Sequence, residues 1–301
     1  MECSKKVSSM SDNEEKPICD DHVIMGKRLS KRLRKQVKEE VEQLVAKYGV
    51  APKLVTVIVG EDEGSQMYVR MKRKASSDAG ILSDHHGLPV TTTQDELLKL
   101  IDSLNKDKTV NGILVQLPLP PHIDEKTIIG AITPLKDVDG FSPVNIYRLF
   151  YGGEELSSAT PHGIVTMLEY IGMKDLSGKH VVVINRSTIV GKPLIFLLLN
   201  RNATVTVCHS KTADLSSFTR QADVLITAIG RRKSQEDPFF ITADMIKDDA
   251  VVIDVATPYG DVDFENVKKK AMCVTPVPGG VGPMTITLLL RNVLDAFVAQ
   301  V

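Results

Sequence analysis

The sequence of 301 residues has few cysteines, no excess of either charge and no long apolar run. Its four cysteines, Cys3, Cys19, Cys208 and Cys273, have no paired spacing, which argues against a zinc site or other metal chemistry and fits reduced thiols. The 37 basic and 38 acidic residues give no electrostatic footprint for nucleic acid or an anionic membrane. No apolar run approaches the length of a membrane span. Partners must therefore be inferred from individual sites.

The first 20 residues are rich in Ser, Lys, Glu and Asp. They lack both an apolar signal core and the Arg-rich, acid-poor character of a transit peptide. We therefore expect residues 1–20 to be a disordered tail and the protein to be cytoplasmic. The length of the chain favours two domains.

The first half of the chain alternates helical and strand patterns. Apolar residues recur about every fourth position from Gly26 to Tyr48, which predicts a surface helix. A buried strand at 54–59 is followed by a helix from Ser65 to Ala79. Another amphipathic helix is predicted from Gln94 to Asn105. An apolar strand is predicted to begin at Gly112 and to end at the prolines that follow it. This order predicts an N-terminal α/β domain.

The second half has short apolar strands at regular intervals, separated by helical or polar segments, at 181–184, 204–208, 224–229 and 251–255. Such alternation is typical of a doubly wound parallel sheet with helices on both faces. Thr160 and Pro161 are a good N-cap and first residue for a helix that leads into this domain. A last helix is predicted over 284–298.

The segment from Pro276 to Thr285 has three prolines and three glycines in ten residues. The prolines fix φ and withhold donors, while the glycines allow positive φ and close approach of a ligand to the backbone. Composition alone leaves two interpretations open, a ligand-lining loop and an ordinary rigid turn.

The GxGxxG fingerprint of dinucleotide-binding folds is absent. However, the strand at 181–184 runs into a polar turn, Asn185 to Pro193, where such folds place their phosphate loop. The next strand ends at residues 208–211 without the acidic residue that NAD-selective folds use for the ribose. Arg186, Ser210 and Lys211 can instead receive a 2′-phosphate, so NADP is favoured over NAD. The alternative is that these are solvated loop residues.

In the first domain, Tyr68 and Lys72 lie one helical turn apart on the same face. Short-chain dehydrogenases share the Tyr-x-x-x-Lys spacing, but there it follows the nucleotide fold and here it precedes it. Gln116 ends an apolar strand, at the edge where open α/β sheets bind ligands. A buried amide needs partners, so Gln116 either orients Lys72 or bonds to a neighbouring loop.

Asp137 and Asp139 flank a valine before Gly140. As a bare pattern this is usually a turn. A carboxylate in a cleft can alternatively bind the paired N–H donors of a guanidine-like heterocycle in bidentate fashion.

Taken in order, six segments resemble the bifunctional methylenetetrahydrofolate dehydrogenase and methenyltetrahydrofolate cyclohydrolase family, and the likeness covers nearly all of the chain after the tail. The sequence departs from the pattern at Asn185 and Ala256, where relatives commonly have glycine, and in the length of the segment 231–238. The segments that carry the resemblance are 65–74, 112–120, 136–141, 160–164, 187–193 and 276–285.

The resemblance implies an α/β protein in which the C-terminal helix returns to the first domain and the active site lies in the interdomain cleft. The folate-binding catalytic domain would comprise residues 21–155 and 284–301. A Rossmann-like dinucleotide-binding domain would comprise residues 156–283. The family likeness also implies a homodimer.

The resemblance further implies that Lys72 is the general acid and base, that Gln116 tunes it, that Tyr68 stacks on the aminobenzoyl part of a folate, and that Asp139 holds the pterin. The other folate-binding residues it implies are Ser65, Val115, Leu117, Pro278, Gly279, Gly280, Val281 and Gly282. Those it implies for the dinucleotide are Asn185, Arg186, Ser187, Gly191, Ser210 and Thr257.

The expected reaction oxidises 5,10-methylenetetrahydrofolate with NADP to the methenyl form and hydrolyses that to 10-formyltetrahydrofolate. One rival is a shikimate- or amino-acid-type NADP dehydrogenase on a similar two-domain frame. Another is a non-catalytic regulator that binds a dinucleotide or folate. A substrate panel separates the first rival from the main interpretation, and the second predicts binding without turnover.

Overall fold

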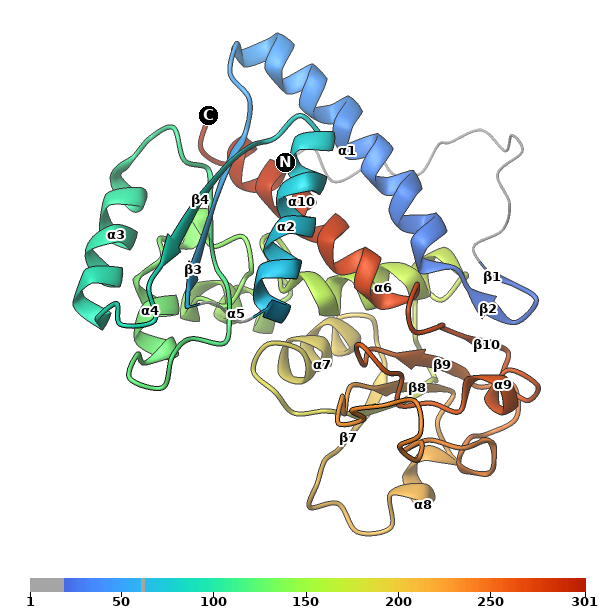
Figure 1. Cartoon of the computed structure of the whole chain (residues 1–301). Helices are drawn as coiled ribbons and strands as arrows, with labels where there is room; N and C mark the ends of the chain where they lie inside the picture. Colours follow the sequence, from blue (N-terminus) through green and yellow to red (C-terminus); the bar gives the residue numbers. More distant parts are fainter. Residues whose placement is uncertain (1–18, 61–62) are drawn as a thin grey trace.

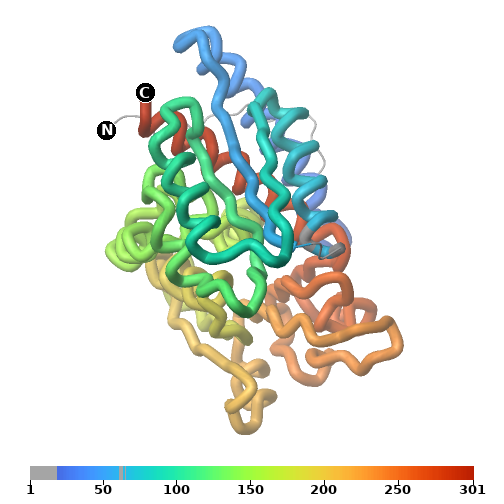
Figure 2. Tube along the Cα trace, turned by 60° about the vertical axis from the view of Figure 1, so that its left-hand side comes forward, coloured from blue at the N-terminus to red at the C-terminus, as the bar shows by residue number. Residues whose placement is uncertain are grey.

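A computed structural model describes residues 19–60 and 63–301, and leaves aside the side chains of Glu63 and Ser65 (Figure 1). The expected tail, residues 1–20, therefore lies outside the described residues except for Cys19 and Asp20. The helices and strands gather around two sheets, which we call the small sheet and the large sheet. Figure 2 shows the part of the chain from blue to green above the part from yellow to orange, with the red C-terminal helix returning to the upper part.

The small sheet has three parallel strands in the order β4-β3-β5. Its central strand β3 (Lys53–Val59) is buried over six of its seven residues, and β5 (Gly112–Val115) is buried throughout. The edge strand β4 (Leu82–Leu88), which the sequence did not reveal, is mostly exposed. The helices of this part are α1 (Gly26–Tyr48), α2 (Glu63–Asp78), α3 (Gln94–Lys106), α4 (Glu125–Ala131) and α5 (Pro143–Phe150).

The large sheet has seven strands in the order β1-β2-β10-β9-β8-β6-β7. All are parallel to their neighbours except β1, which pairs antiparallel with β2. The expected parallel sheet is confirmed. Its strands are β1 (Cys19–Asp20), β2 (Val23–Ile24), β6 (His180–Ile184), β7 (Thr204–Cys208), β8 (Val224–Thr227), β9 (Val251–Asp254) and β10 (Cys273–Val274), and its helices include α7 (Gly191–Leu199), α8 (Leu215–Thr219) and α9 (Phe264–Val267).

The hairpin of β1 and β2 extends the large sheet. The family resemblance instead implies that residues from 21 onward belong to the first domain. A disulfide joins Cys19 of β1 to Cys273 of β10. The expectation of reduced thiols is therefore wrong for these two cysteines, because sheet pairing brings together residues that are 254 positions apart. Cys208 is free and buried.

Helix α10 (Val281–Val298) crosses between the two sheets, as predicted for the C-terminal helix, and packs against α1, α2 and α6 (Ala159–Tyr170) (Figure 1). It begins three residues before the expected Met284, since Gly280 is its N-cap. Helix α6 begins at Ala159 with Ser158 as N-cap, two residues before the predicted cap Thr160.

The composition of α10 contradicts one prediction from the sequence, that no apolar segment approaches the length of a membrane span. By length and composition alone, α10 is apolar enough to cross a membrane. Most of it is buried within the fold, since it contacts helices on several sides. Leu289 and Val293 of α10 share one core cluster with Leu29 of α1 and Val183 of β6. A helix that packs against neighbours on several sides is expected to be apolar over most of its surface.

Candidate active site

A cavity of about 1240 Å³ lies between the small-sheet and large-sheet parts. Its walls come from α1, α2, the residues after β5 and β9, and the start of α10. Many of the predicted site residues line it: Tyr68, Lys72, Val115, Gln116, Leu117, Asp139, Thr257, Pro278, Gly279, Gly280, Val281 and Gly282. Ser65 lies on α2, but its side chain is outside the described residues. Asn185, Arg186, Ser187, Gly191 and Ser210 lie beyond this cavity.

Lys72 is buried on the cavity side of α2, with 8% of its surface exposed. Its Nζ donates to Oε1 of Gln116 at 3.1 Å, and Gln116 Nε2 donates to the carbonyl of Leu117 at 2.7 Å. The amide of Gln116 is thereby fixed with its oxygen toward the lysine, which is the first of the two arrangements the sequence allowed. Burial lowers the pKa of Lys72, and the charge of Asp139 offsets part of this effect.

Asp137 and Asp139 have different surroundings. Asp137 is buried and accepts hydrogen bonds from the backbone N–H groups of Gly140 and Ser142 and from the amide of Asn145, so it forms the turn. Asp139 is half-buried and faces the cavity. Loss of hydration raises the pKa of Asp139 to about 6, the charge of Lys72 opposes that rise, and Asp137 adds to it. A carboxylate held at this cost favours a ligand that donates hydrogen bonds to it.

The Pro276–Thr285 segment forms one wall of the cavity as a loop up to Gly280 and then as the first turns of α10. Gly279 has φ +111°, which an L side chain rarely adopts. A Cβ on Gly280 would lie 2.7 Å from the carbonyl oxygen of Pro276. Gly282 has neither constraint. The segment therefore forms a cavity wall with exposed backbone, which agrees with the first of the two interpretations of the sequence, a ligand-lining loop.

Helix α1 fixes this wall. This role could not be predicted from the sequence, because the pattern of α1 is that of an ordinary amphipathic surface helix. The backbone N–H of Lys27 donates to Gly279 O at 2.8 Å. Arg34 Nε donates to Thr287 Oγ1 at 3.0 Å and Arg34 Nη2 to Pro283 O at 3.3 Å. Ser30 Oγ bonds to the same two partners, at 2.8 and 3.1 Å. Donors from α1 thus hold the first turns of α10.

Asp254, at the end of β9, is a second cavity carboxyl that sequence patterns did not single out. Burial and the neighbouring Asp261 raise the pKa of Asp254 to about 7. Asp254 accepts hydrogen bonds from the backbone N–H groups of Ala256 and Val262, both at 3.0 Å. It therefore shapes the segment that contains Thr257.

The other predicted dinucleotide residues gather at the carboxyl edge of the large sheet. Ile184 of β6 pairs directly with Cys208 of β7, so Arg186 and Ser210 follow neighbouring strand ends. Asn185 Oδ1 accepts from the backbone N–H groups of Ser187 and Gly191 at 2.7 and 3.1 Å, and its Nδ2 donates to Ala228 O. The Asn185 side chain thus organises its own loop and leaves Arg186 exposed.

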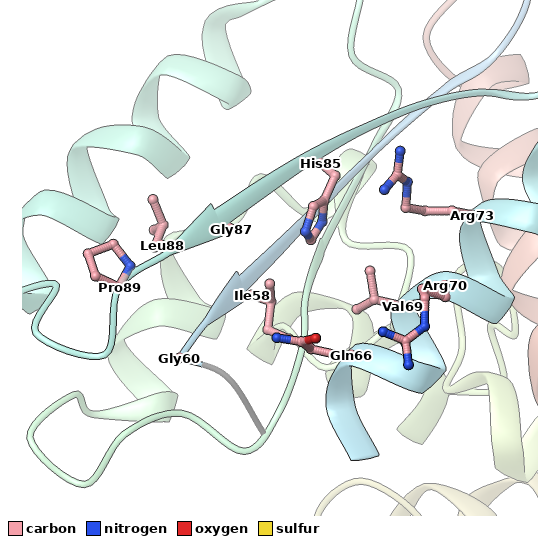
Figure 3. Close-up of a pocket in the computed structure, with 10 residues that line it drawn as sticks. All are labelled: Ile58, Gly60, Gln66, Val69, Arg70, Arg73, His85, Gly87, Leu88 and Pro89. Atoms are coloured by element: carbon pink, nitrogen blue, oxygen red, sulfur yellow. The ribbon is translucent and has the colours of Figure 1, made fainter. Parts of the chain in front are cut away.

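A smaller cavity of about 410 Å³ lies on the other side of α2, between this helix and strands β3 and β4 (Figure 3). Arg70, Arg73 and His85 line it. Burial and the charge of Arg73 lower the pKa of His85. Because Lys72 and Gln116 line only the larger cavity, the smaller one is separate from the candidate active site.

Comparison with known proteins places this geometry in a family. Residues 24–139 match the family model "Tetrahydrofolate dehydrogenase/cyclohydrolase, catalytic domain", and residues 158–301 match "Tetrahydrofolate dehydrogenase/cyclohydrolase, NAD(P)-binding domain". The "Bifunctional protein FolD" of Moorella thermoacetica is 53% identical over 281 residues, which cover 91% of this chain and 98% of the relative.

Two solved structures agree. The FolD methylenetetrahydrofolate dehydrogenase/cyclohydrolase of Campylobacter jejuni has a TM-score of 0.86 at 45% identity, over 91% of this chain and 98% of that one. The Trypanosoma brucei enzyme, complexed with NADP cofactor and inhibitor, also has a TM-score of 0.86, at 38% identity over 92% and 97%. The chain belongs to the tetrahydrofolate dehydrogenase/cyclohydrolase family.

Proposed function

We propose that this protein oxidises 5,10-methylenetetrahydrofolate with NADP to the methenyl form and hydrolyses the methenyl form to 10-formyltetrahydrofolate. The observation that carries the proposal is the buried Lys72, bonded to Gln116 and facing Asp139 across one cavity between the two family domains. A shikimate- or amino-acid-type dehydrogenase does not agree with the two family models that match the chain. A regulator that only binds has no use for a buried lysine whose pKa is lowered.

In the proposed substrate pose, the carboxylate of Asp139 accepts the paired N–H donors of the pterin. The ring of Tyr68 stacks on the aminobenzoyl group, and the backbone from Pro278 to Gly282 closes the opposite side. Val115 and Leu117 flank the strand end. These groups exclude water and orient the substrate, and they thereby bring the methylene carbon to one fixed position.

The dehydrogenase step removes a hydride from the methylene carbon and leaves a methenyl cation. NADP, when bound, supplies the acceptor for that hydride. In the proposal its 2′-phosphate contacts Arg186 and Ser210, and its remaining groups contact Asn185, Ser187, Gly191 and Thr257. Arg186 and Lys211 fit an anion, because both are exposed and neither has an ion-pair partner in the part of the chain that the structure describes.

In the cyclohydrolase step, water adds to the methenyl carbon and Lys72, as the neutral amine, takes a proton from that water. The carbon–N5 bond then breaks, the hydroxyl proton is lost as the formyl group forms on N10, and the Lys72 ammonium returns a proton to N5. One proton is released in total. The lowered pKa of Lys72 favours the neutral amine, and the carbonyl of Gln116 holds Nζ in place.

The proposal includes a homodimer, supported by the exposed edge strand β4 and the hollow beside it (Figure 3). Such an edge is a template for pairing with a second strand. It also includes a cytoplasmic location without nucleic-acid or membrane partners, which the near balance of charge supports. Light scattering on the intact protein tests the dimer, and a monomeric mass at micromolar concentration contradicts it.

The activity is tested by following oxidation of methylenetetrahydrofolate spectroscopically with NADP and NAD in parallel, and then hydrolysis of methenyltetrahydrofolate without a dinucleotide. We expect turnover in both assays and preference for NADP. Lys72→Met should lose cyclohydrolase activity while keeping its fold. Lys99→Met, an exposed lysine of α3 outside the cavity, is the matched control. Full cyclohydrolase turnover by folded Lys72→Met refutes the assignment.

A further inference from the structure

Helix α2 separates two cavities. Its residues Tyr68 and Lys72 line the large cavity, whereas Val69, Arg70 and Arg73 line the small cavity of about 410 Å³ (Figure 3). Residues three and four apart share a face of a helix, so these two sets lie on different faces of α2. The candidate active site uses the first set only. The second set has no role in the proposed function.

Strands β3 and β4 form the floor of the small cavity. Parallel pairing places Ile58 beside Gly87 and Thr56 beside His85. Ile58, His85 and Gly87 all line the cavity, which agrees with strand side chains two positions apart pointing to the same face. Gly87 contributes no side chain, and a Cβ added there would be in ordinary contact with His85 Nε2, at 3.6 Å. The hollow thus opens over a strand position without a side chain.

The charge of the small cavity is positive. Arg70 and Arg73 are both exposed, and neither guanidinium has an ion pair or a hydrogen bond within the described residues 19–60 and 63–301. The described residues that line the cavity include no aspartate or glutamate. Two arginines therefore face one hollow without a carboxylate to neutralise them.

His85 is a further polar group of this hollow, and its ionisation agrees with the uncompensated charge. The pKa of His85 is lowered, first by burial and then by the charge of Arg73, while a hydrogen bond to the backbone of Thr56 opposes the shift. A neighbouring carboxylate would have raised it instead. The amide of Gln66 also lines the cavity. An anion in the hollow would meet polar groups from both α2 and β4 (Figure 3).

Two arginines suit a phosphate group better than a single carboxylate. A guanidinium presents a planar fork of N–H donors, and one carboxylate occupies one such fork. A phosphate monoester carries about two negative charges at neutral pH and three acceptor oxygens, so it can accept from both arginines and from a third donor. The other lining residues with side chains are apolar and offer a surface to an organic group: Ile58, Val69, Leu88 and Pro89.

We propose that the small cavity binds a phosphate group, with its oxygens at Arg70 and Arg73. This inference does not depend on the proposed function, since neither arginine lines the large cavity. A second copy that pairs along the edge of β4 would border the cavity rather than fill it, because the lining residues of β3 and β4 share the face of the sheet beneath α2. The bound group contacts the back of the helix that carries Lys72.

The test measures binding of inorganic phosphate and of phenyl phosphate to the full-length protein by isothermal titration calorimetry at constant ionic strength. We expect both to bind. The double variant Arg70→Gln/Arg73→Gln should bind each about tenfold more weakly, since each exposed ion pair contributes a factor of a few. Tighter binding of phenyl phosphate by the wild type identifies an ester as the ligand, because the apolar floor then contributes, whereas equal Kd values identify free phosphate.

Lys99→Gln/Lys108→Gln is the matched control, because it removes two exposed charges of the same part of the protein outside both cavities. It should bind both ligands as the wild type does. No detectable binding to the wild type, or equal affinity of the wild type and the double arginine variant, overturns the inference. Loss of binding in Arg186→Gln alone assigns the phosphate to the dinucleotide site and overturns it as well.

The fold and the turnover of the double arginine variant are checked by circular dichroism and by the cyclohydrolase assay. Both should match the wild type, because the substituted side chains lie outside the large cavity. If the double variant does not fold, the single variants Arg70→Gln and Arg73→Gln decide, each with a Kd expected to be a few-fold higher. A wild type that binds phosphate but turns over no folate contradicts the proposed function and leaves this site standing.

Discussion

The ionisation of Asp139 should set the lower pH limit of folate binding. The pKa of Asp139 is raised from 3.8 to about 6 in the free protein, a shift that corresponds to roughly 3 kcal/mol disfavouring the carboxylate. A pterin that donates two hydrogen bonds to the carboxylate stabilises the ionised form. Binding therefore competes with protonation below pH 6 and is unaffected well above it.

The size of the effect follows from the ionised fraction. About nine-tenths of the Asp139 carboxyl is ionised at pH 7 and about one-tenth at pH 5, so the apparent Kd should rise about tenfold over this range. Isothermal titration calorimetry with folic acid measures Kd without turnover. Asp139→Asn should bind more weakly at pH 7 and show little dependence on pH. A wild-type Kd that is constant from pH 5 to pH 7, or an Asn variant as tight as wild type, refutes the reasoning.

Three further predictions concern single contacts. Gln116→Ala removes the acceptor of Lys72 and should lower the cyclohydrolase rate by roughly tenfold to a hundredfold, measured in single-substrate assays, while Kd for NADP stays constant. Thr287→Val removes the hydroxyl that accepts from Arg34 and should cost about 2 kcal/mol of unfolding free energy, or roughly 4 °C in Tm by calorimetry; an unchanged Tm contradicts the assigned network. Cys273→Ser removes the disulfide to Cys19 and should lower the free energy of unfolding by up to about 5 kcal/mol under oxidising conditions. Dithiothreitol should destabilise the wild type but not the variant, so an equal loss of stability in both on its addition would contradict the prediction.

Much of the fold could be predicted from local sequence patterns. The parallel strands were predictable because buried strands have continuous apolar runs. The contact of Gln116 with Lys72 was one of two arrangements predicted for an amide at the carboxyl end of such a strand. The family resemblance then implied roles that no local pattern predicts. Asp139 is an example, since the sequence alone did not distinguish it from the turn-forming Asp137.

What the sequence missed depends on contacts between distant segments. The pairing of β2 with β10 brings Cys19 to Cys273, and nothing in the spacing of the cysteines predicts it. Ser30 and Arg34 resemble ordinary polar positions of a surface helix until α10 is packed against them. Element ends were displaced for a similar reason, because the position at which α10 begins is decided by the geometry of Gly280 against Pro276.

The central place of α10 has a consequence for the order in which the parts of the protein can pack. Residues 281–298 fill the space between α1, α2 and α6, all of which precede them in the sequence. The apolar faces that these helices turn toward α10 therefore stay unpaired in a nascent chain until α10 has been synthesised. A chain truncated before Val281 would still encode both sheets but would leave the cavity without one wall, so the integrity of this one helix bears directly on activity.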